Sequence, residues 1–299
     1  MTDSGKRLSP VPNFDLTVTF AALKPAHRLM PAMQWMGRIV LADIGIEAAT
    51  DWFEIGRPVL PPLDPTGYKY TRGLVLALAG EMPGAIALAA SAAAKSGAGY
   101  VQIGTSRPLS GVPSAIGQVG SPPVNDYRLG CLLVGPGMGP IPQLLTFALT
   151  SRAPKVLDAD AISDLGDPER LHGQDAVITP HAGEFLRLFG EEESDRKHEQ
   201  ALAAAKRSQS VVVFKGPDTV VAAPDGRLGF APPAPAWLAT AGSGDVLSGM
   251  IAAFRARRME AFDAACAAVW LHGRAAEIAG PAMIADNLVE AIPLALADL

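Results

Sequence analysis

The chain has 299 residues, 49% of them apolar and 18% charged, a balance that supports a large buried core and excludes disorder as the default. A net charge of −5 excludes the basic surface that binding of a nucleic acid polymer requires. The two cysteines, Cys131 and Cys266, lie in apolar runs, which indicates buried thiols in a reducing compartment.

The sequence shows no targeting or membrane segment. Residues 1–20 lack the unbroken apolar core of a signal peptide. The apolar stretch 85–94 is too short and too rich in alanine to span a bilayer. We therefore expect a cytoplasmic protein without a membrane partner.

The first sixty residues differ from the rest of the chain in their pattern of predicted elements. Residues 17–20 and 38–41 are each predicted to form a strand. A proline cluster follows, at Pro58, Pro61, Pro62 and Pro65. We therefore expect a boundary near residue 60, with an N-terminal extension over 1–60 and the main domain over 61–299.

Short apolar runs alternate with helical patterns from residue 71 onward. The predicted strands cover 74–79, 100–103, 131–134, 155–157, 176–178, 211–214 and 219–223. The predicted helices cover 84–96, 161 onward, 185–189, 191–206, 245 onward and 262 onward. Such alternation predicts an α/β fold with a mostly parallel sheet covered by helices on both faces. Ligands of such sheets bind at the carboxyl ends of the strands, where the polar motifs of this chain fall.

Two motifs follow the strands 131–134 and 155–157. The glycine-rich loop 135–139 is suited to close contact with a flat or anionic ligand, or to a tight connection from strand to helix. The carboxylates of Asp158 and Asp160 are suited to Mg²⁺, usually through waters. Alternatively, Asp160 caps the helix that follows it.

A third motif follows the strand 176–178. Thr179 is placed to cap the next helix, with Pro180 at its first position. That arrangement leaves His181 and, in the first turn, Glu184 facing the crevice at the strand ends. The other four histidines show no metal-ligand spacing, and we expect them to be structural or on the surface.

A lysine ends the apolar strand 211–214. Lys215, followed by Gly216, is suited to meeting a phosphate as a point charge. The alternative is a β-turn built from Gly216, Pro217 and Asp218.

The most informative motif is Gly242-Ser243-Gly244-Asp245, which joins a glycine turn to a helix. The apolar residues that follow repeat every four positions, which predicts the helix. Gly242 and Gly244 let backbone N–H groups approach an anion, and the helix directs its positive end toward that anion. Asp245 is then placed to take a proton from a hydroxyl that attacks phosphorus. Alternatively, it is simply an acidic residue in a first helical turn, where acidic residues are favoured.

The order of these motifs resembles that of the NAD(P)H-hydrate dehydratases, members of the ribokinase-like superfamily. The similarity runs from about residue 71 to residue 293. It is carried by the segments 133–139, 157–161, 178–184, 214–219, 242–249 and 271–275. The resemblance implies a ribokinase-like three-layer sandwich with a mostly parallel central sheet.

The family restores NADH and NADPH from their hydrated forms, NADHX and NADPHX. It uses ADP or ATP with Mg²⁺ to dehydrate the S epimer. The resemblance implies that the ring hydroxyl is first phosphorylated, because hydroxide is a poor leaving group. Phosphate then leaves and the double bond re-forms. Related proteins assemble as homo-oligomers, so we expect a homo-oligomer here.

The resemblance also implies roles for individual residues. Asp245 is the base, made weaker by the helix N-terminus, and the anion hole is the turn Gly242, Ser243 and Gly244. The implied nucleotide contacts are Lys215, Gly216, Pro217, Asp218, Thr219 and Gly244. The implied substrate contacts are Ala85, Gly137, Gly139, His181 and Asp245. The implied metal ligands are Asp158, Asp160 and Glu184.

The chain departs from the family pattern at three places. Tyr-Thr-Arg-Gly at 70–73 stands where the family has Lys-x-x-Gly. Glu81 stands in the family's Gly-Gly-Ser turn and puts a negative charge near the expected substrate pocket. Trp237 replaces part of an Asn-Pro-Gly-Met-like stretch, where it either stacks on a base or fills a gap in the core.

Residues 13–46 resemble the tail of the NAD(P)H-hydrate epimerase domain that is often fused upstream. The body of that domain is missing from the sequence, so we expect no epimerase activity. The remnant is expected to pack as an extra hairpin on the main domain or on a neighbouring subunit.

Two other functions stay open beside the dehydratase. One is a related kinase of a small alcohol, such as a hydroxymethylpyrimidine or a sugar. The other is a catalytically silent nucleotide-binding module, suggested by Glu81 and by the missing lysine. The segment 178–184 favours the dehydratase over the kinase.

Overall fold

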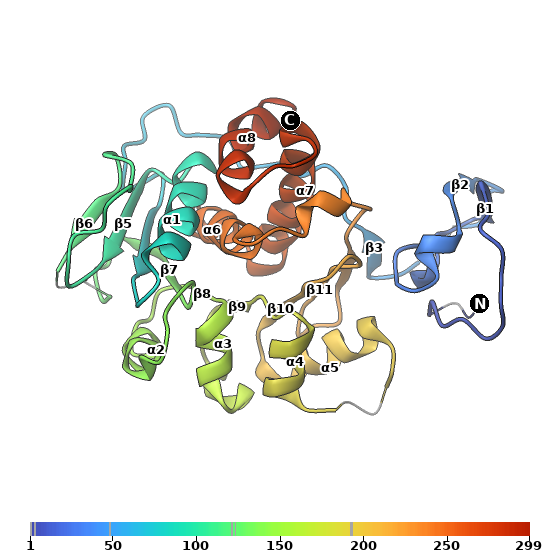
Figure 1. The fold of residues 1–299 in the computed structure, drawn as a ribbon, viewed down its shortest axis with the longest axis horizontal. Helices are drawn as coiled ribbons and strands as arrows, with labels where there is room; N and C mark the ends of the chain where they lie inside the picture. Colours follow the sequence, from blue (N-terminus) through green and yellow to red (C-terminus); the bar gives the residue numbers. More distant parts are fainter. Residues whose placement is uncertain (1, 3, 48, 121, 123, 192–193) are drawn as a thin grey trace.

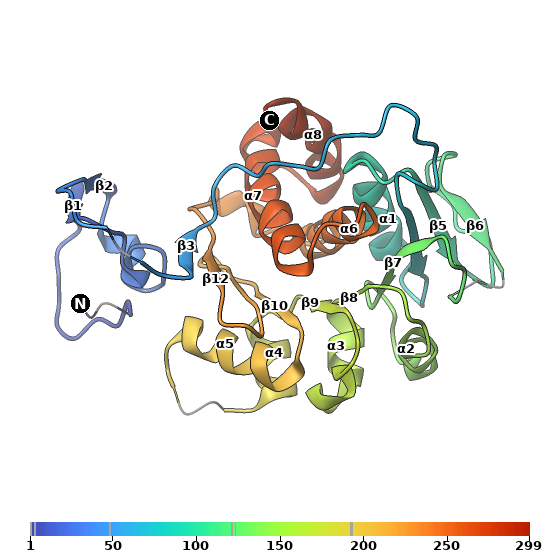
Figure 2. The same ribbon diagram turned by 180° about the vertical axis from the view of Figure 1, so that it is seen from behind.

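The computed structural model describes residues 2, 4–47, 49–120, 122, 124–191 and 194–299. Its main body is a ten-stranded sheet between two layers of helices (Figure 1). One face of the sheet is covered by α1 (Pro83–Lys95), α6 (Ser243–Ala256), α7 (Ala261–Ala279) and α8 (Ala285–Ala297). The other face is covered by α2 (Pro142–Leu149), α3 (Ala159–Leu165), α4 (Ala182–Phe189) and α5 (Lys197–Ser208) (Figure 2). The predicted three-layer α/β architecture is therefore confirmed.

The strands of this sheet lie in the order β3–β12–β11–β10–β9–β8–β7–β4–β5–β6. Their bounds are β3 (Trp52–Glu54), β4 (Leu74–Leu78), β5 (Tyr100–Gly104), β6 (Gly117–Val119), β7 (Leu129–Val134), β8 (Lys155–Leu157), β9 (Ala176–Ile178), β10 (Val211–Phe214), β11 (Val220–Ala222) and β12 (Leu228–Phe230). β11 is antiparallel to both of its neighbours, and the other pairs are parallel. The central strands β4, β8, β9 and β10 are buried throughout, which explains their continuous apolar sequences.

All seven strands predicted for the main domain are present, within a few residues of the expected bounds. The structure adds strands β3, β6 and β12 and helices α2 and α8, which were not predicted. The added strands have only three residues each, too few to show a period.

The topology places the polar motifs side by side. β7, β8, β9 and β10 are parallel neighbours, so the loops that follow them emerge at the same edge of the sheet. Helix α6 packs on β7 and β8 and begins at that edge. The predicted convergence of the motifs is therefore a consequence of the strand order.

The N-terminal extension forms a second, two-stranded sheet of β1 (Leu16–Phe20) and β2 (Arg38–Ala42) (Figure 1). Both strands were predicted, but they pair in parallel, so the expected hairpin is wrong. The 3₁₀ turns η1 (Pro25–His27) and η2 (Met33–Trp35) lie between them. β3 also precedes residue 60, yet it pairs with β12 in the main sheet. None of the helices that the structure describes combines the length and apolar character needed to cross a membrane.

Candidate functional site

The glycine turn leads directly into helix α6, as predicted. Gly242 is the N-cap residue and has a φ of +84°, a conformation that favours glycine. A Cβ on Gly242 would lie 2.8 Å from Leu88 Cδ1 and 2.9 Å from Ala285 Cβ, so the turn has no room for a side chain. The N–H and hydroxyl of Ser243 both donate to the carbonyl of Thr240, which fixes the shape of the turn.

Asp245 lies in the first turn of α6 and is partly buried. Burial raises its pKa to about 7, and the negative charges of Asp158, Asp160 and Glu184 add to this effect against the opposing charge of Lys215. The expectation that the helix N-terminus makes Asp245 a weaker base is therefore wrong, because desolvation outweighs the helix field. A carboxylate with a pKa near 7 is well matched to proton transfer at neutral pH.

Lys215 links three of the predicted motifs. Its Nζ lies 2.7 Å from Asp158 Oδ1 and 4.0 Å from Glu184 Oε2. A Cβ on Gly244 would lie 3.3 Å from the same Nζ, so the ammonium group lies beside the glycine turn. Burial disfavours the charge of Lys215, but the surrounding carboxylates outweigh burial and raise its pKa. The lysine thus brings a permanent positive charge to the mouth of α6.

Asp158 and Asp160 have separate roles in the structure. Asp158 is the N-cap of α3 and accepts a hydrogen bond from Ala159 N, so the alternative that Asp160 caps this helix is wrong. Asp160 Oδ2 instead accepts from Gly139 N at 2.8 Å and ties down the glycine-rich loop. Ala159 between them has a φ of +46°, a strained conformation for a residue other than glycine. Such strain concentrates at functional sites.

The carboxylates implied as metal ligands are engaged with protein donors. Among the residues that the structure describes, no group of three or more His, Cys, Asp or Glu side chains is placed to hold a metal ion. Asp158 binds Lys215, Asp160 binds Gly139 N–H, and Glu184 binds the backbone of His181. The carboxylate oxygens of Asp158, Asp160 and Glu184 are nevertheless hard ligand atoms, the type that Mg²⁺ prefers when phosphates supply its other ligands.

The glycine-rich loop 135–139 packs against protein backbone. A Cβ on Gly135 would lie 1.8 Å from the carbonyl oxygen of Asp158, and one on Gly137 would lie 2.6 Å from that of Met82. Both glycines have positive φ angles. Close packing between neighbouring loops therefore explains these glycines without a ligand, and the predicted substrate contacts of Gly137 and Gly139 stay predictions.

Glu81 lies over this loop. A Cβ on Gly139 would lie 3.0 Å from Cγ and from Oε2 of Glu81, so the carboxylate is close to the loop backbone. Ala85 faces the same loop, with its Cβ 2.9 Å from the Cβ position of Gly137. The structure thus groups Glu81, Ala85, Gly137 and Gly139 at one end of the strand edge.

His181, and not Thr179, caps helix α4. Its Nδ1 accepts from Gly183 N at 2.9 Å and from Glu184 N at 3.3 Å, while Glu184 Oε2 accepts from His181 N. Thr179 is fully buried and donates its hydroxyl to Leu157 O, and the helix begins at Ala182, so the predicted cap is wrong. The other ring nitrogen of His181, Nε2, lies 3.3 Å from Glu184 Oε1, and the side chain is more than half exposed.

The loop 215–219 is shaped by its own hydrogen bonds. Thr219 Oγ1 accepts from Gly216 N at 3.1 Å and donates to Gly216 O at 2.8 Å. The carboxylate of Asp218 is buried against Lys197 and the backbone of Met30. Asp218 is one of the predicted nucleotide contacts. Because both of its carboxylate oxygens are engaged, only its backbone is available to a ligand.

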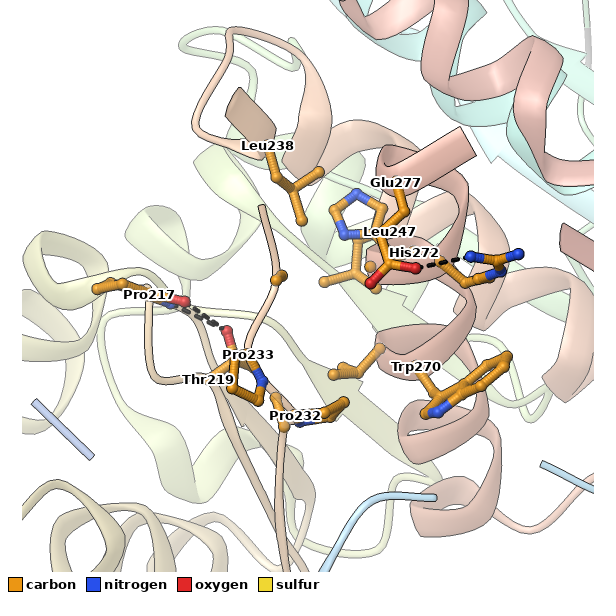
Figure 3. Close-up of a pocket in the computed structure, with 15 residues that line it drawn as sticks. Pro217, Thr219, Pro232, Pro233, Leu238, Leu247, Trp270, His272 and Glu277 are labelled. Atoms are coloured by element: carbon orange, nitrogen blue, oxygen red, sulfur yellow. Dashed lines mark hydrogen bonds and ion pairs between the residues drawn. The ribbon is translucent and has the colours of Figure 1, made fainter. Parts of the chain in front are cut away.

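A cavity of about 180 Å³ lies between this loop and helix α7 (Figure 3). Pro217 and Thr219 line one side, and Trp270 and His272 line the other (Figure 3). Its lining is mostly apolar and also contains Thr219, His272, Arg274 and Glu277, a combination that suits the base and ribose of a nucleotide. Trp237 takes no part in the lining and donates its indole N–H to Ala276 O at 3.0 Å.

His272 is a site residue that the sequence interpretation missed. It is buried, and its Nε2 lies 2.9 Å from the carbonyl oxygen of Ser243 in the glycine turn. Burial lowers its pKa to about 4, so the ring is neutral and donates to Ser243 O. His272 thus joins the cavity to the turn. Its place in the segment 271–275 was the signal that pointed to it.

The fold is that of the ribokinase-like α/β proteins. A ribokinase-like superfamily protein from Enterococcus faecalis shares this architecture with a TM-score of 0.70 at 21% identity, over 82% of this chain and 97% of that chain. A narrower assignment follows from the sequence profile of the NAD(P)H-hydrate dehydratase family, which matches residues 74–294. The chain belongs to this family.

Individual relatives agree with the assignment. The chain is 39% identical to the bifunctional NAD(P)H-hydrate repair enzyme of Mycobacterium tuberculosis, over 88% of this chain and 58% of that protein. It is 34% identical to the ADP-dependent (S)-NAD(P)H-hydrate dehydratase of Bacillus subtilis, over 74% of this chain and 86% of that protein. The ADP/ATP-dependent dehydratase of B. subtilis, co-crystallised with ATP/Mg²⁺, matches with a TM-score of 0.68 and 31% identity over 80% of this chain and 94% of that chain. The chain spans 58% to 65% of the length of the bifunctional relatives.

Proposed function

We propose that this protein dehydrates the S epimer of NADHX and NADPHX in a reaction driven by ADP or ATP. The observation that carries the proposal is the position of Asp245, a partly buried carboxylate with a pKa of about 7 beside a glycine turn and a lysine. Family membership and the names of the relatives support the choice of substrate.

The nucleotide is proposed to occupy the cavity beside the loop 215–219. Gly216, Pro217 and Thr219 would contact the nucleoside, with its phosphates directed toward Lys215 and Gly244. The Lys215 ammonium would exchange part of its contact with Asp158 for a phosphate oxygen, because it lies beside the glycine turn already. Either ADP or ATP would fit, since the proposed anion contacts are the Lys215 ammonium and backbone N–H groups, which bind the phosphates of both.

Asp245 is proposed to take the proton of the ring hydroxyl as that oxygen attacks the terminal phosphoryl group. The turn Gly242, Ser243 and Gly244 would form the anion hole, with the N–H groups of Gly244 and Asp245 as its donors. The phosphorylated intermediate then loses phosphate and the double bond re-forms. Ala85, Gly137, Gly139 and His181 would hold the hydrated dinucleotide.

Mg²⁺ fits this site as a companion of the nucleotide. Asp158, Asp160 and Glu184 are the carboxylates nearest to Asp245 in its electrostatic surroundings, and they would hold the ion through waters. When bound, the ion neutralises charge on the phosphates. The residues of the chain then need only to position the donor and the acceptor.

The extension 1–60, whose residues 13–46 carry the resemblance, is proposed to correspond to the tail of an epimerase domain joined to the main domain 61–299, with β3 added to the main sheet. In support, the similarity to a bifunctional repair enzyme of Moorella thermoacetica covers 99% of this chain. We also propose a cytoplasmic homo-oligomer, which light scattering on the purified protein would test.

The proposed function is tested by offering the protein S-NADHX, Mg²⁺ and ADP or ATP, and then a panel of small alcohols in place of NADHX. Recovery of NADH absorbance supports the dehydratase. A stable phosphorylated alcohol without elimination would instead support a kinase. Nucleotide binding without turnover of any substrate would indicate a silent module.

A further inference from the structure

The N-terminal extension contacts the loop 215–219 through Asp218, a loop residue that does not line the cavity. Leu29 of the extension is 1% exposed and is part of the apolar core that lies on the α5 face of the sheet. The next residue, Met30, donates its backbone N–H to Asp218 Oδ2 at 3.0 Å. Leu29 and Met30 thus anchor the extension in the main domain, next to the proposed nucleotide loop.

Asp218 also forms an ion pair with Lys197, the first residue of α5. Lys197 Nζ lies 2.6 Å from Asp218 Oδ1 and donates to the carbonyl of Lys215 at 3.3 Å. The same ammonium lies over the ring of Phe214, 4.7 Å from its centroid. One ion pair therefore contacts both ends of the loop, and both of its side chains are mostly buried.

The backbone of the loop lies directly on this ion pair. A Cβ on Gly216 would lie 2.6 Å from Lys197 Nζ and 3.0 Å from Asp218 Oδ1. On its other side the loop presents Gly216, Pro217 and Thr219 to the cavity. The ion pair therefore supports the backbone of the residues that face the cavity.

We propose that Leu29, Met30, Lys197 and Asp218 form a latch through which the N-terminal extension positions the nucleotide-binding loop. The latch rests on the proposed function, because it acts through the nucleotide site. Its members are positioning residues: Met30 and Lys197 bind Asp218 of the loop, and Leu29 holds Met30 in place through its burial in the core. A loop held in place before binding loses less conformational freedom when the nucleotide binds, and its affinity is higher for that reason.

The experiment measures ADP affinity by calorimetry, in the presence of Mg²⁺, for the full chain and its variants. Leu29→Ala removes the buried anchor of the extension at a position that lies outside both the loop and the cavity lining. We expect about tenfold weaker ADP binding, which corresponds to about 1.4 kcal/mol, with kcat at saturating ADP within about twofold. Leu29→Met keeps the buried volume and should restore the affinity.

A matched control lies in the same contact region. Lys6→Ala breaks the exposed ion pair between Lys6 of the extension and Asp195, near α5. Exposed pairs contribute little, so ADP affinity should stay within about twofold of that of the unaltered protein. Thermal unfolding of every variant separates lost stability from lost affinity.

Asp218→Asn provides a second variant, which leaves no cavity in the apolar core. It keeps an acceptor for Met30 N–H but removes the charge that holds Lys197, so it should weaken ADP binding as Leu29→Ala does. Lower melting temperatures with unchanged ADP affinity in both variants would overturn the latch and reduce the contact to packing. Failure of the unaltered protein to bind ADP or ATP would instead contradict the proposed function, and the latch with it.

Discussion

Lys215 donates a hydrogen bond to Asp158, with Nζ 2.7 Å from Oδ1, and so connects the carboxyl ends of two strands that are not adjacent in the sheet. Strand β9 lies between β8 and β10, and helix α4, which follows β9, supplies Glu184 to the same ammonium. The charge of the lysine is therefore held in the middle of the motif edge, beside the mouth of α6. This arrangement leads to four predictions.

The first prediction concerns the pH dependence of turnover. Asp245 must be ionised to accept a proton, and its pKa is raised to about 7. The value of kcat/KM should therefore fall about tenfold per pH unit below pH 7 and be level above it. Lys215 does not change the pH profile of kcat/KM in this range, because its pKa is raised above its ordinary value of 10.5. A level profile between pH 5 and pH 8, measured as an initial rate, would assign the proton transfer to another group.

The second prediction concerns stability. The pKa of Asp245 rises from its ordinary value of 3.8 to about 7 on folding, so the neutral form stabilises the fold. That stability is fully present below about pH 4 and is lost as the pH rises to about 7. Asp245→Asn cannot ionise and should have a higher melting temperature than the unaltered protein at pH 8, with a smaller difference at pH 5. Calorimetric melting at both pH values checks the sign, and an Asn variant that is less stable at pH 8 contradicts it.

The third prediction separates the anion hole from ordinary helix geometry. Gly244→Ala places a Cβ 3.3 Å from Lys215 Nζ, where a phosphate is expected. We expect kcat to fall by about 10² or more, the typical effect of disturbing an oxyanion hole, with a small change in melting temperature. Gly84→Ala is the matched control, because Gly84 also lies in a first helical turn and its Cβ position is open. Equal values of kcat for the two variants would contradict the proposed contact between Gly244 and the phosphoryl group.

The fourth prediction concerns Glu81. Its carboxylate lies close to Gly139, at the end of the edge where the anionic dinucleotide is proposed to bind. Glu81→Ser restores a small residue and removes a like charge, so KM for the hydrated cofactor should fall several-fold while KM for ADP does not change. Steady-state kinetics with each substrate varied in turn checks this. A higher KM for the cofactor would mean that Glu81 helps to bind it.

The convergence of the site could be predicted from the sequence, because parallel strands that end in polar motifs bring those motifs to one edge. The details of the helix caps could not. Thr179-Pro180 is a good capping sequence, yet the buried Thr179 bonds to β8 and His181 takes over as the cap. That choice depends on which residue the neighbouring strand buries, which is tertiary information.

The pKa of Asp245 and the latch share this dependence on distant residues. The local sequence predicted a stabilised anion at a helix N-terminus. Burial and the charges of Asp158, Asp160 and Glu184, which lie at the starts of α3 and α4, reverse that effect. Likewise, Asp218 was assigned to the nucleotide from its place in the loop, whereas its partners Lys197 and Met30 lie 21 and 188 positions away along the chain.

The central claim is that Asp245 takes the proton from a hydroxyl whose phosphate is then eliminated. The most direct test follows NADPH absorbance and phosphate release together when the protein and its Asp245→Asn variant are given S-NADPHX, Mg²⁺ and ADP. The account predicts equal amounts of NADPH and phosphate from the unaltered protein, and no NADPH from a variant that still binds ADP within a few-fold. NADPH formation by the variant at the rate of the unaltered protein would contradict it.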